Sequence, residues 1–534
     1  MTLMKRRSMR WIAAFGVLLI AASGAMPAHA ATYEPISGSG STWSQNALDQ
    51  WRTNVASNYG MTVNYNGVGS TQGRREYING DLDFAVSEIP FQSRPEDGSA
   101  PEVPPFGYAY MPIVAGGTAF MYHLNIGGKR VTNLRLSGPV ITKIFTGAIT
   151  KWNDPAIQAD NPGLAMPDRA IVPVVRSDGS GSSAQFSLWM SKQHGDLWTA
   201  GMKSQFPTPA NGKALKGSDG VSGYVAQGYG EGSITYVEYS YALEQGFPVA
   251  KVLNKADYYV EPTADSVAVA LMQAQINTDL TQILDGVYNS GDPRTYPLSS
   301  YSYMIVPTAL GGKTFTEKKG STLSTFASYM LCEGQQQAED LGYSPLPMNL
   351  VLAGFEQIRR IPGSTATTDP NTCNNPTFKP GDSPSSNQLA LTAAQPADCD
   401  KRGPNQCVTG TAGAKQETVV TGSGTGGSAS GAPGAGGGAA GGDAAGGDAA
   451  AAGTAGATAG GAAGGADAVY DSSGNLISGG SGGVAGQAIA SPFKIDGEAW
   501  GWQQSVMLGV VLLLIAVVAV PPFLSGRFRG KAAR

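Results

Sequence analysis

The segment from 409 to 490 most constrains how this chain of 534 residues can fold. It consists almost wholly of Gly, Ala and Ser with scattered Asp and Thr, and 441–450 repeats the pattern GGDAA. Such a sequence cannot bury enough apolar surface to offset the entropy of ordering it, so we expect a flexible, disordered linker. It explains the excess of glycine, and it confines the folded body to about 33–362, with a cysteine-containing extension at 363–408.

Both ends of the chain indicate export and membrane attachment. Residues 1–30 combine a basic start, a short apolar run and a small-residue motif, as in a secretory signal peptide cleaved after Ala30. Residues 503–524 form an uncharged, apolar stretch long enough to span a bilayer, and the tail 525–534 is basic. We therefore expect a C-terminal transmembrane helix that anchors the protein to the cell membrane, with the tail in the cytoplasm and the binding domain outside. A buried core helix is the alternative for this segment.

The charge of the exported part argues against one class of partner. The net charge falls from −4 to −12 when the eight basic residues of the two ends are removed. On that balance we expect no nucleic-acid partner, and an anion would have to be bound by a local arrangement of donors.

Four cysteines lie in the exported part, where disulfides persist. They allow three pairings, and we predict Cys332–Cys373, which would pin the tail to the body, and Cys399–Cys407, which would close a short loop. The spacing does not suit a zinc site, which needs closer pairs.

The folded body alternates short strand-like runs with longer helix-like runs. The expected strands are 62–65, 83–86, 171–175 and 233–237, and the expected helices are 46–59, 72–79, 182–193 and 321–332. This alternation predicts an α/β fold with mostly parallel sheets, and the length of the body favours two lobes.

Three loops rich in Gly and Ser, at 37–43, 67–73 and 176–183, each lead into an expected helix. Glycines let the backbone approach a ligand closely, and a helix start offers unpaired N–H groups with a partial positive charge. One such loop could be ordinary helix capping. Three in one chain, one of them with Arg176, indicate an anion-binding site.

Enzyme motifs are missing from the sequence. Beyond the signal peptide the histidines are His123 and His194, and no close pair of ligands suggests a metal site. GGKT at 311–314 resembles the end of a P-loop, but Pro307 occupies the position of the required first glycine. No GxSxG elbow precedes a helix in a catalytic-triad order. We therefore expect no catalytic residues, no metal and no cofactor.

Several motifs together resemble those of one known family. They are ISGSGSTW (36–43), NYNGVGST (64–71), DFAVSEIP (83–90), IFTGAITKWNDPAI (144–157), RSDGSGSS (176–183) and GSITYVEYSYA (232–242). From about Ile36 to Leu346 the chain is similar to the phosphate-binding proteins of bacterial phosphate ABC transporters. The resemblance implies a two-lobed periplasmic binding protein that closes on one phosphate in the cleft between its lobes and delivers it to ABC permease subunits. The lobes would be 33–114 with 295–362, and 115–294.

The resemblance also assigns the ligand-binding residues. They supply hydroxyls, backbone N–H groups, one guanidinium and one carboxylate, and they are Thr42, Trp43, Ser70, Glu88, Arg176, Ser180, Gly181 and Ser182. Asp178 would orient Arg176 from behind. Three positions depart from the family's usual residues: Trp43 replaces Phe, Ser182 replaces Thr and Glu88 replaces Asp. Monohydrogen phosphate can donate its proton to a carboxylate and sulfate cannot, so Glu88 would select phosphate.

Other interpretations of these residues stay open. Glu88 could be a surface residue that caps a helix or pairs with Arg94, and Trp43 could be ordinary core packing. The chain could also be a cell-surface binding or adhesion protein that reuses the fold without transport, or a phosphate-ester hydrolase on the same fold.

Overall fold

The computed structural model describes residues 33–366, 373–379, 381–383, 385–418, 469–470 and 476–478. The expected signal peptide at 1–30, the apolar segment at 503–524 and the basic tail at 525–534 lie outside the described residues. Among the helices of the described part, none is both long enough and apolar enough to cross a bilayer.

One long strand, β4 (Tyr108–Tyr122), organises the body. Its first part pairs antiparallel with β15 (Ser299–Pro307), whereas its last part, from Thr118 onward, pairs with β10 (Ser233–Glu238) and β11 (Val249–Leu253). The main strand order is β2-β1-β3-β15-β4-β10-β8-β9. We call β2, β1, β3, β15 and the start of β4 the first sheet region. The end of β4 with β10, β8, β9 and β11 is the second sheet region.

The other strands are short. Those of the first sheet region are β1 (Ile36–Gly40), β2 (Val63–Gly67) and β3 (Phe84–Ser87). Those of or beside the second sheet region are β7 (Arg135–Leu136), β8 (Val172–Arg176), β9 (Lys213–Leu215) and β12 (Tyr259–Val260). Two further pairs are β5 (Asn125–Ile126) with β6 (Lys129–Arg130), and β13 (Gln275–Ile276) with β14 (Gln282–Ile283).

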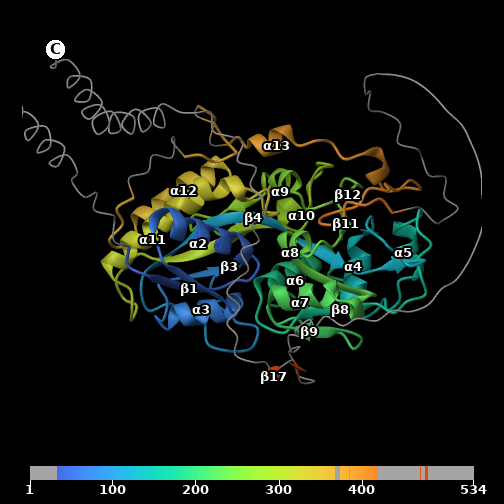
Figure 1. The fold of residues 1–534 in the computed structure, drawn as a ribbon, viewed down its shortest axis with the longest axis horizontal. Coiled ribbons are helices and arrows are strands. Elements are labelled where there is room, and N and C mark those ends of the chain that lie inside the picture. The colour runs from blue at the N-terminus through green and yellow to red at the C-terminus, as the bar shows by residue number, and fades with distance from the viewer. Residues whose placement is uncertain are drawn as a thin grey trace, which may run out of the picture. The chain divides into compact units, whose positions relative to one another are not determined.

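Helices cover both sheet regions (Figure 1). Those that come before β4 or after β15 in the chain are α2 (Gln45–Tyr59), α3 (Ser70–Ile78), α11 (Glu317–Leu331) and α12 (Met348–Arg359). Those that lie between β4 and β15 in the chain are α4 (Gly138–Phe145), α5 (Pro155–Asp160), α6 (Gly181–Gln193), α7 (Gly217–Ala226), α8 (Tyr239–Glu244), α9 (Ala264–Leu271) and α10 (Asp285–Tyr288). The short helix α13 (Gln388–Thr392) packs against α9. Single 3-10 turns are Gly228–Gly230, Glu333–Gln337 and Asp398–Asp400.

Local sequence accounts for many element ends. Ser180, Thr263 and Thr316 are N-caps of α6, α9 and α11, and each hydroxyl accepts a hydrogen bond from a backbone N–H of the first turn. Helix α2 ends at Gly60, whose φ of 65° is left-handed. The expected α/β class is confirmed, and so are the type and position of the expected strands and helices, with ends shifted by a few residues. The expectation of mostly parallel sheets is wrong, because β4 and β15 pair antiparallel with their neighbours and make the main sheet mixed.

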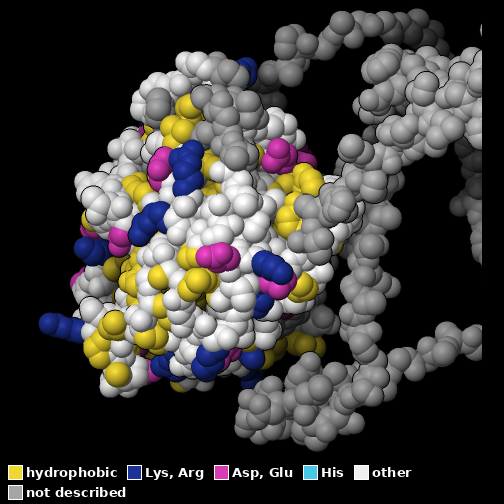
Figure 2. All heavy atoms as spheres, turned by 90° about the vertical axis from the view of Figure 1, so that its left-hand side faces the viewer, with side chains coloured by type: hydrophobic (Ala, Val, Ile, Leu, Met, Phe, Trp, Pro, Cys, Tyr) yellow, Lys and Arg dark blue, Asp and Glu magenta, His cyan; other side chains and the backbone are white. Residues whose placement is uncertain are grey.

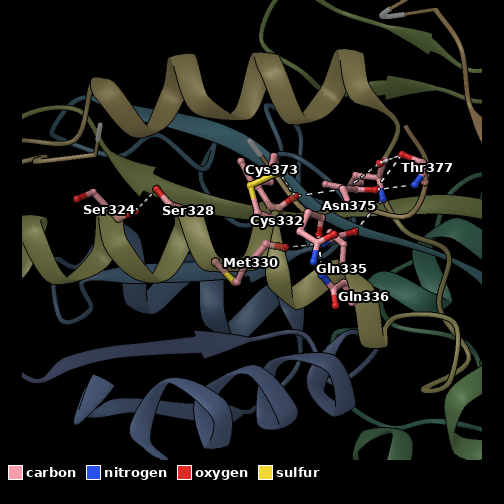
Figure 3. Close-up of a disulfide and its surroundings, with 12 residues drawn as sticks. Ser324, Ser328, Met330, Cys332, Gln335, Gln336, Cys373, Asn375 and Thr377 are labelled. Atoms are coloured by element: carbon pink, nitrogen blue, oxygen red, sulfur yellow. Dashed lines mark hydrogen bonds between the residues drawn. A yellow bond between two sulfur atoms is a disulfide. The ribbon is translucent and has the colours of Figure 1, made fainter. Parts of the chain in front are cut away.

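The extension after α12 is fastened beside the first sheet region by a disulfide (Figure 3). Cys373 is bonded to Cys332, which directly follows the last turn of α11. Asn375 Nδ2 and Thr377 Oγ1 both donate to the backbone oxygen of Leu346, at 3.2 and 2.7 Å. The predicted Cys332–Cys373 pairing is confirmed.

Further along, the extension packs against the second sheet region. The predicted Cys399–Cys407 disulfide is confirmed. Within its loop, the Asp400 carboxylate accepts two hydrogen bonds from Lys251 Nζ of β11, at 2.7 and 2.8 Å. Arg135 Nη1 donates to a backbone oxygen of the same loop at 2.8 Å.

Residues 409–418, which the sequence assigned to the linker, belong instead to the folded body. Thr411 donates through its N–H to Thr132 O (3.1 Å) and through Oγ1 to Val249 O (2.6 Å). Thr418 Oγ1 accepts from Thr132 N at 2.7 Å. These hydrogen bonds, made by the backbone and by two threonine hydroxyls, order a segment whose composition alone predicts disorder.

A second departure from the expected linker lies in a separate compact unit of the chain. There β16 (Val469–Tyr470) pairs antiparallel with β17 (Leu476–Ser478). Both strands coincide with apolar interruptions of the Gly/Ala pattern. The rest of the expected linker beyond 418 lies outside the described residues.

The Lys251–Asp400 pair leads to a stability prediction. Both side chains are buried, with 11% and 10% exposed. Lys251→Met would leave the Asp400 carboxylate buried without its cation, so we expect the free energy of unfolding in urea to fall by about 3–5 kcal/mol. The double variant Lys251→Met/Asp400→Leu should recover most of that loss, because it removes both charges together.

The matched control is an exposed pair of the same type, Lys151–Asp168, whose side chains are 57% and 64% exposed. Lys151→Met should change the free energy of unfolding by less than about 1 kcal/mol. Equal losses in Lys251→Met and Lys151→Met would contradict the structural role of the buried pair.

Candidate functional site

The three Gly/Ser segments of the sequence lie at the ends of strands that run parallel to their neighbours. The first was expected to be a loop at 37–43, but residues 37–40 belong to β1; the second follows β2, which is parallel to β1, and the third follows β8, which is parallel to β9 and β10. The carboxyl ends of parallel strands meet at one edge of a sheet, where α/β proteins bind ligands. The second and third loops lead directly into α3 at Ser70 and α6 at Gly181.

Arg176, the last residue of β8, is a buried cation held by one carboxylate. It is 2% exposed. Its guanidinium forms a fork with Asp178, in which Nε donates to Oδ1 at 2.7 Å and Nη2 donates to Oδ2. Burial by itself raises the pKa of Asp178, but the hydrogen bonds and charge of Arg176 outweigh burial and hold that pKa below its usual value. Burial likewise lowers the pKa of Arg176, but Asp178 outweighs it and the pKa is raised, so Arg176 is charged at neutral pH.

Thr42 and Arg176 meet through Ser218, in the first turn of α7. Arg176 Nη1 donates to Ser218 Oγ at 3.3 Å, and the hydroxyl oxygens of Ser218 and Thr42 are 2.9 Å apart. Ser218 N also donates to Thr42 Oγ1 at 3.1 Å. Sequence analysis did not single out Ser218. The stretch Gly-Ser-Asp-Gly at 217–220 has the same composition at a helix start as the three loops, and that pattern could have found it.

Glu88, which follows β3, is a buried hydrogen-bond acceptor. It is 1% exposed, which rules out the surface alternative. Its Oε2 accepts from Ser70 Oγ at 2.8 Å and its Oε1 accepts from Ser302 Oγ at 2.9 Å, so hydroxyl groups, and not Arg94, occupy the carboxylate. Ser302 lies on β15, and nothing in the sequence near it indicates a site residue.

The start of α6 places Ser180, Gly181 and Ser182 at the same site. Gly181 N donates to Ser70 Oγ at 3.2 Å. A Cβ on Gly181 would lie 2.0 Å from Glu88 Oε2, so glycine is the residue that fits between Glu88 and the start of α6. Ser180 Oγ accepts from Ser183 N at 3.3 Å as the N-cap, whereas Ser182 Oγ is buried and has no hydrogen-bond partner among the described residues.

Trp43 has the contacts of a core residue. It is 1% exposed and packs edge-on against Tyr343, with ring centroids 5.8 Å apart. Its backbone N–H donates to Ser41 Oγ at 2.9 Å. Its indole Nε1 is buried with no hydrogen-bond partner in the described part of the chain. Core packing therefore describes what Trp43 does in this structure, and a ligand contact stays a prediction.

Hydrogen bonds at the site join the two sheet regions directly. Besides the contacts of Thr42 and Ser70, Thr71 N donates to Gly179 O at 3.1 Å, and Gln185 Nε2 donates to Glu88 O at 2.8 Å. Outside these contacts lies an open cavity of about 430 Å³, lined by residues that include Thr71, Asp178 and Lys216. The site residues are thus enclosed between the two regions, with the open cavity outside them.

On one face of the molecule, Figure 2 shows acidic and basic side chains interspersed, without a large area of one sign that would favour an anion. Within the described ranges, no group of three or more His, Cys, Asp or Glu side chains could hold a metal ion. The positive charge available to a ligand is therefore local, from Arg176 and the helix starts.

Comparison with known proteins matches this architecture. A family model described as the PBP superfamily domain, for periplasmic binding proteins, matches residues 25–333. The phosphate-binding protein PstS of Xylella fastidiosa is 33% identical over 322 residues, which cover 59% of this chain and 82% of the relative. The phosphate-binding protein PstS 3 of Mycobacterium tuberculosis is 33% identical over 318 residues, covering 58% of this chain and 82% of the relative. A phosphate-binding protein structure from Stenotrophomonas maltophilia has 19% identity and a TM-score of 0.46, covering 60% of this chain and 93% of that one.

The fold and the enclosed site are those of a substrate-binding protein, a class without enzymatic activity. The chain belongs to the PBP superfamily and, within it, to the family of the phosphate-binding proteins PstS.

Proposed function

We propose that this protein captures inorganic phosphate outside the cytoplasm and delivers it to the permease subunits of an ABC transporter. The observation that carries the proposal is that a buried guanidinium, Arg176, and a buried carboxylate, Glu88, both border the loop at 176–183 that leads into α6, and that the partners of Glu88 Oε1 and Oε2 among the described residues are hydroxyl groups. The relatives named phosphate-binding protein support the same ligand.

The cationic side of the site suits an oxyanion. Arg176 is already oriented by Asp178, so binding an anion requires little further loss of side-chain freedom. The N-terminus of α6 adds backbone N–H groups and a partial positive charge. Ser182 Oγ is a buried hydroxyl without a partner in the described residues, and a phosphate oxygen could accept its proton.

The carboxylate side of the site suits an oxyanion that carries a proton. Ser70 and Ser302 hold Glu88 in place from its two oxygens. Each carboxylate oxygen retains acceptor capacity beyond one hydroxyl bond, so a protonated phosphate oxygen can donate to it. Sulfate has no such proton at neutral pH, and its oxygens would be repelled.

Closure follows from the shared strand β4. We propose lobes at 33–114 with 295–362 and at 115–294, which rotate about the point near Thr118 where β4 changes partners. The hydrogen bonds that join the two sheet regions would then belong to the closed form. The proposed signal peptide at 1–30 would direct export and be cleaved, and the proposed transmembrane helix at 503–524 would keep the protein at the surface near its permease.

Ligand-dependent thermal stability tests the ligand. A soluble form comprising residues 31–418 retains the extension that packs on the body. At phosphate concentrations about 1,000 times Kd we expect stabilisation of about 4 kcal/mol, seen as a higher Tm, because phosphate binds only the folded state. Equimolar sulfate should leave Tm unchanged. If sulfate raises Tm as much as phosphate, the ligand assignment is wrong.

Uptake measurements test delivery separately. Deleting the gene should slow phosphate uptake at low external phosphate, and restoring the protein should recover it. Normal uptake in a strain lacking the protein, together with a positive thermal shift, would favour surface binding without transport. Phosphatase activity of the purified protein would favour the hydrolase alternative.

A further inference from the structure

A small, partly open cavity lies beside β4 and β15, where β4 changes partners. It is lined by Thr118, Gln185, Trp189, Leu284, Tyr288, Leu298, Ser299 and Ser300, all of them buried. The centre of a water molecule can occupy about 10 Å³ within it. That is the room needed for a single water molecule.

Four polar atoms of this lining are buried and unpaired. Within the part of the chain that the structure describes, no hydrogen-bond partner is found for Thr118 Oγ1, Gln185 Oε1, Tyr288 OH or Ser300 Oγ. A buried polar atom without a partner is unfavourable, and few occur in native proteins. Four around one small cavity therefore point to a shared partner that the protein atoms do not supply.

The backbone and one hydrogen bond explain why these atoms converge. Ser300 is paired with Gly116 across the sheet, and Thr118 follows two residues after Gly116, so both side chains lie on the same sheet face. The amide of Gln185 is oriented by Nε2, which donates to Glu88 O at 2.8 Å. Its Oε1 is therefore the atom left for the cavity. Tyr288 comes from α10, which contacts α6.

We propose that this cavity holds one ordered water molecule. Water has two protons to donate and can accept two hydrogen bonds, and it matches a site with one obligate acceptor, Gln185 Oε1, and three hydroxyls that can donate or accept. The lining contains no carboxylate, so a cation is disfavoured. An apolar ligand would leave all four polar atoms unpaired.

The water has a structural role that follows from its neighbours. It links β4 and β15, the strands near the change of pairing partner, to α6 and α10. Helix α6 carries Gly181 and Ser182 of the candidate anion site at its start. The water therefore helps to fix that helix on the strands, whichever anion binds.

Two tyrosine variants of the full chain test the proposal, because the ordered water predicts that they change the Tm differently. Tyr288→Phe removes a hydroxyl from the cavity, so we expect the Tm to fall by about 2–4 °C as the water loses a partner. Tyr77→Phe is the matched control, because Tyr77 is 0% exposed and its OH also lacks a partner within the described ranges. It should leave the Tm unchanged or raise it, since it removes an unpaired buried group. A dry cavity predicts the same effect in both variants, and that result overturns the proposal.

A crystal structure supplies a readout that does not depend on folding of the variants. The expected result is one density peak in the cavity with protein oxygens at about 2.6–3.1 Å. An empty cavity overturns the proposal. A peak with oxygens at about 2.4 Å that is lost in sodium-free buffer also overturns it, because a sodium ion would then occupy the site.

Discussion

Replacing Arg176 with alanine is expected to abolish phosphate binding. The side chain is the buried full positive charge of the candidate site, and its fork with Asp178 orients it before a ligand arrives. Truncation removes the charge and leaves the half-buried Asp178 carboxylate without its cation, so a negative charge next to the site is no longer neutralised. We expect the Kd measured by calorimetry to rise at least about 1,000-fold, or about 4 kcal/mol.

Two further variants make this result specific. Arg176→Lys keeps the charge but loses the planar fork, so its affinity should lie between those of the wild type and Arg176→Ala. Arg169→Ala removes an arginine whose partner, Glu231, lies in an exposed ion pair, and it should bind phosphate as the wild type does. A folded Arg176→Ala protein that binds within tenfold of the wild type would remove Arg176 from the site.

The second large effect concerns selectivity, and it depends on Glu88. Glu88→Gln replaces an acceptor-only carboxylate with an amide that can donate to an oxyanion. We expect sulfate to bind more tightly and phosphate less tightly. The Kd for sulfate divided by the Kd for phosphate, both measured by competition calorimetry, should fall at least about 100-fold, or about 2.8 kcal/mol.

The conservative variant Glu88→Asp is the control for this prediction. It keeps the carboxylate but moves it one methylene back from Ser70 and Ser302, which hold the longer side chain. Phosphate affinity should drop while the preference for phosphate over sulfate remains. If Glu88→Gln keeps the full preference for phosphate over sulfate, then Glu88 does not select the ligand. That result would leave the assignment of phosphate as the ligand untouched.

Local patterns in the sequence were enough to predict the α/β class and many elements. The loops before α3 and α6 are visible because glycine and serine at a helix start have a local physical cause. Strand β4 was missed, although it organises the body. It contains Pro112 and the pair Gly116-Gly117, which usually end strands. In the structure Pro112 lies at an irregularity in the pairing with β15, where it can be accommodated.

The residues that sequence analysis missed act through distant contacts. Ser302 supports Glu88 across 214 positions of the chain, and Ser218 supports Thr42 across 176. The Gly/Ser pattern at 217–220 marks Ser218 as a helix-start residue, but no local pattern encodes either pairing, because the fold alone brings the partners together. The ordered segment 409–418 was missed for a related reason. Its hydrogen bonds, made by the backbone and by the hydroxyls of Thr411 and Thr418, join it to distant strands, and composition does not describe such contacts.

The extension from 373 to 418 is attached to both sheet regions, which bears on the proposed opening of the cleft. A covalent bond at Cys373 fixes one part of it beside the first sheet region, and the ion pair at Asp400 fixes another part to the second. Between them, α13 packs against α9. If the proposed lobes rotate about β4, they would separate only as far as this span allows before α13 detached from α9. The extension would then set an upper limit to the amplitude of that proposed rotation.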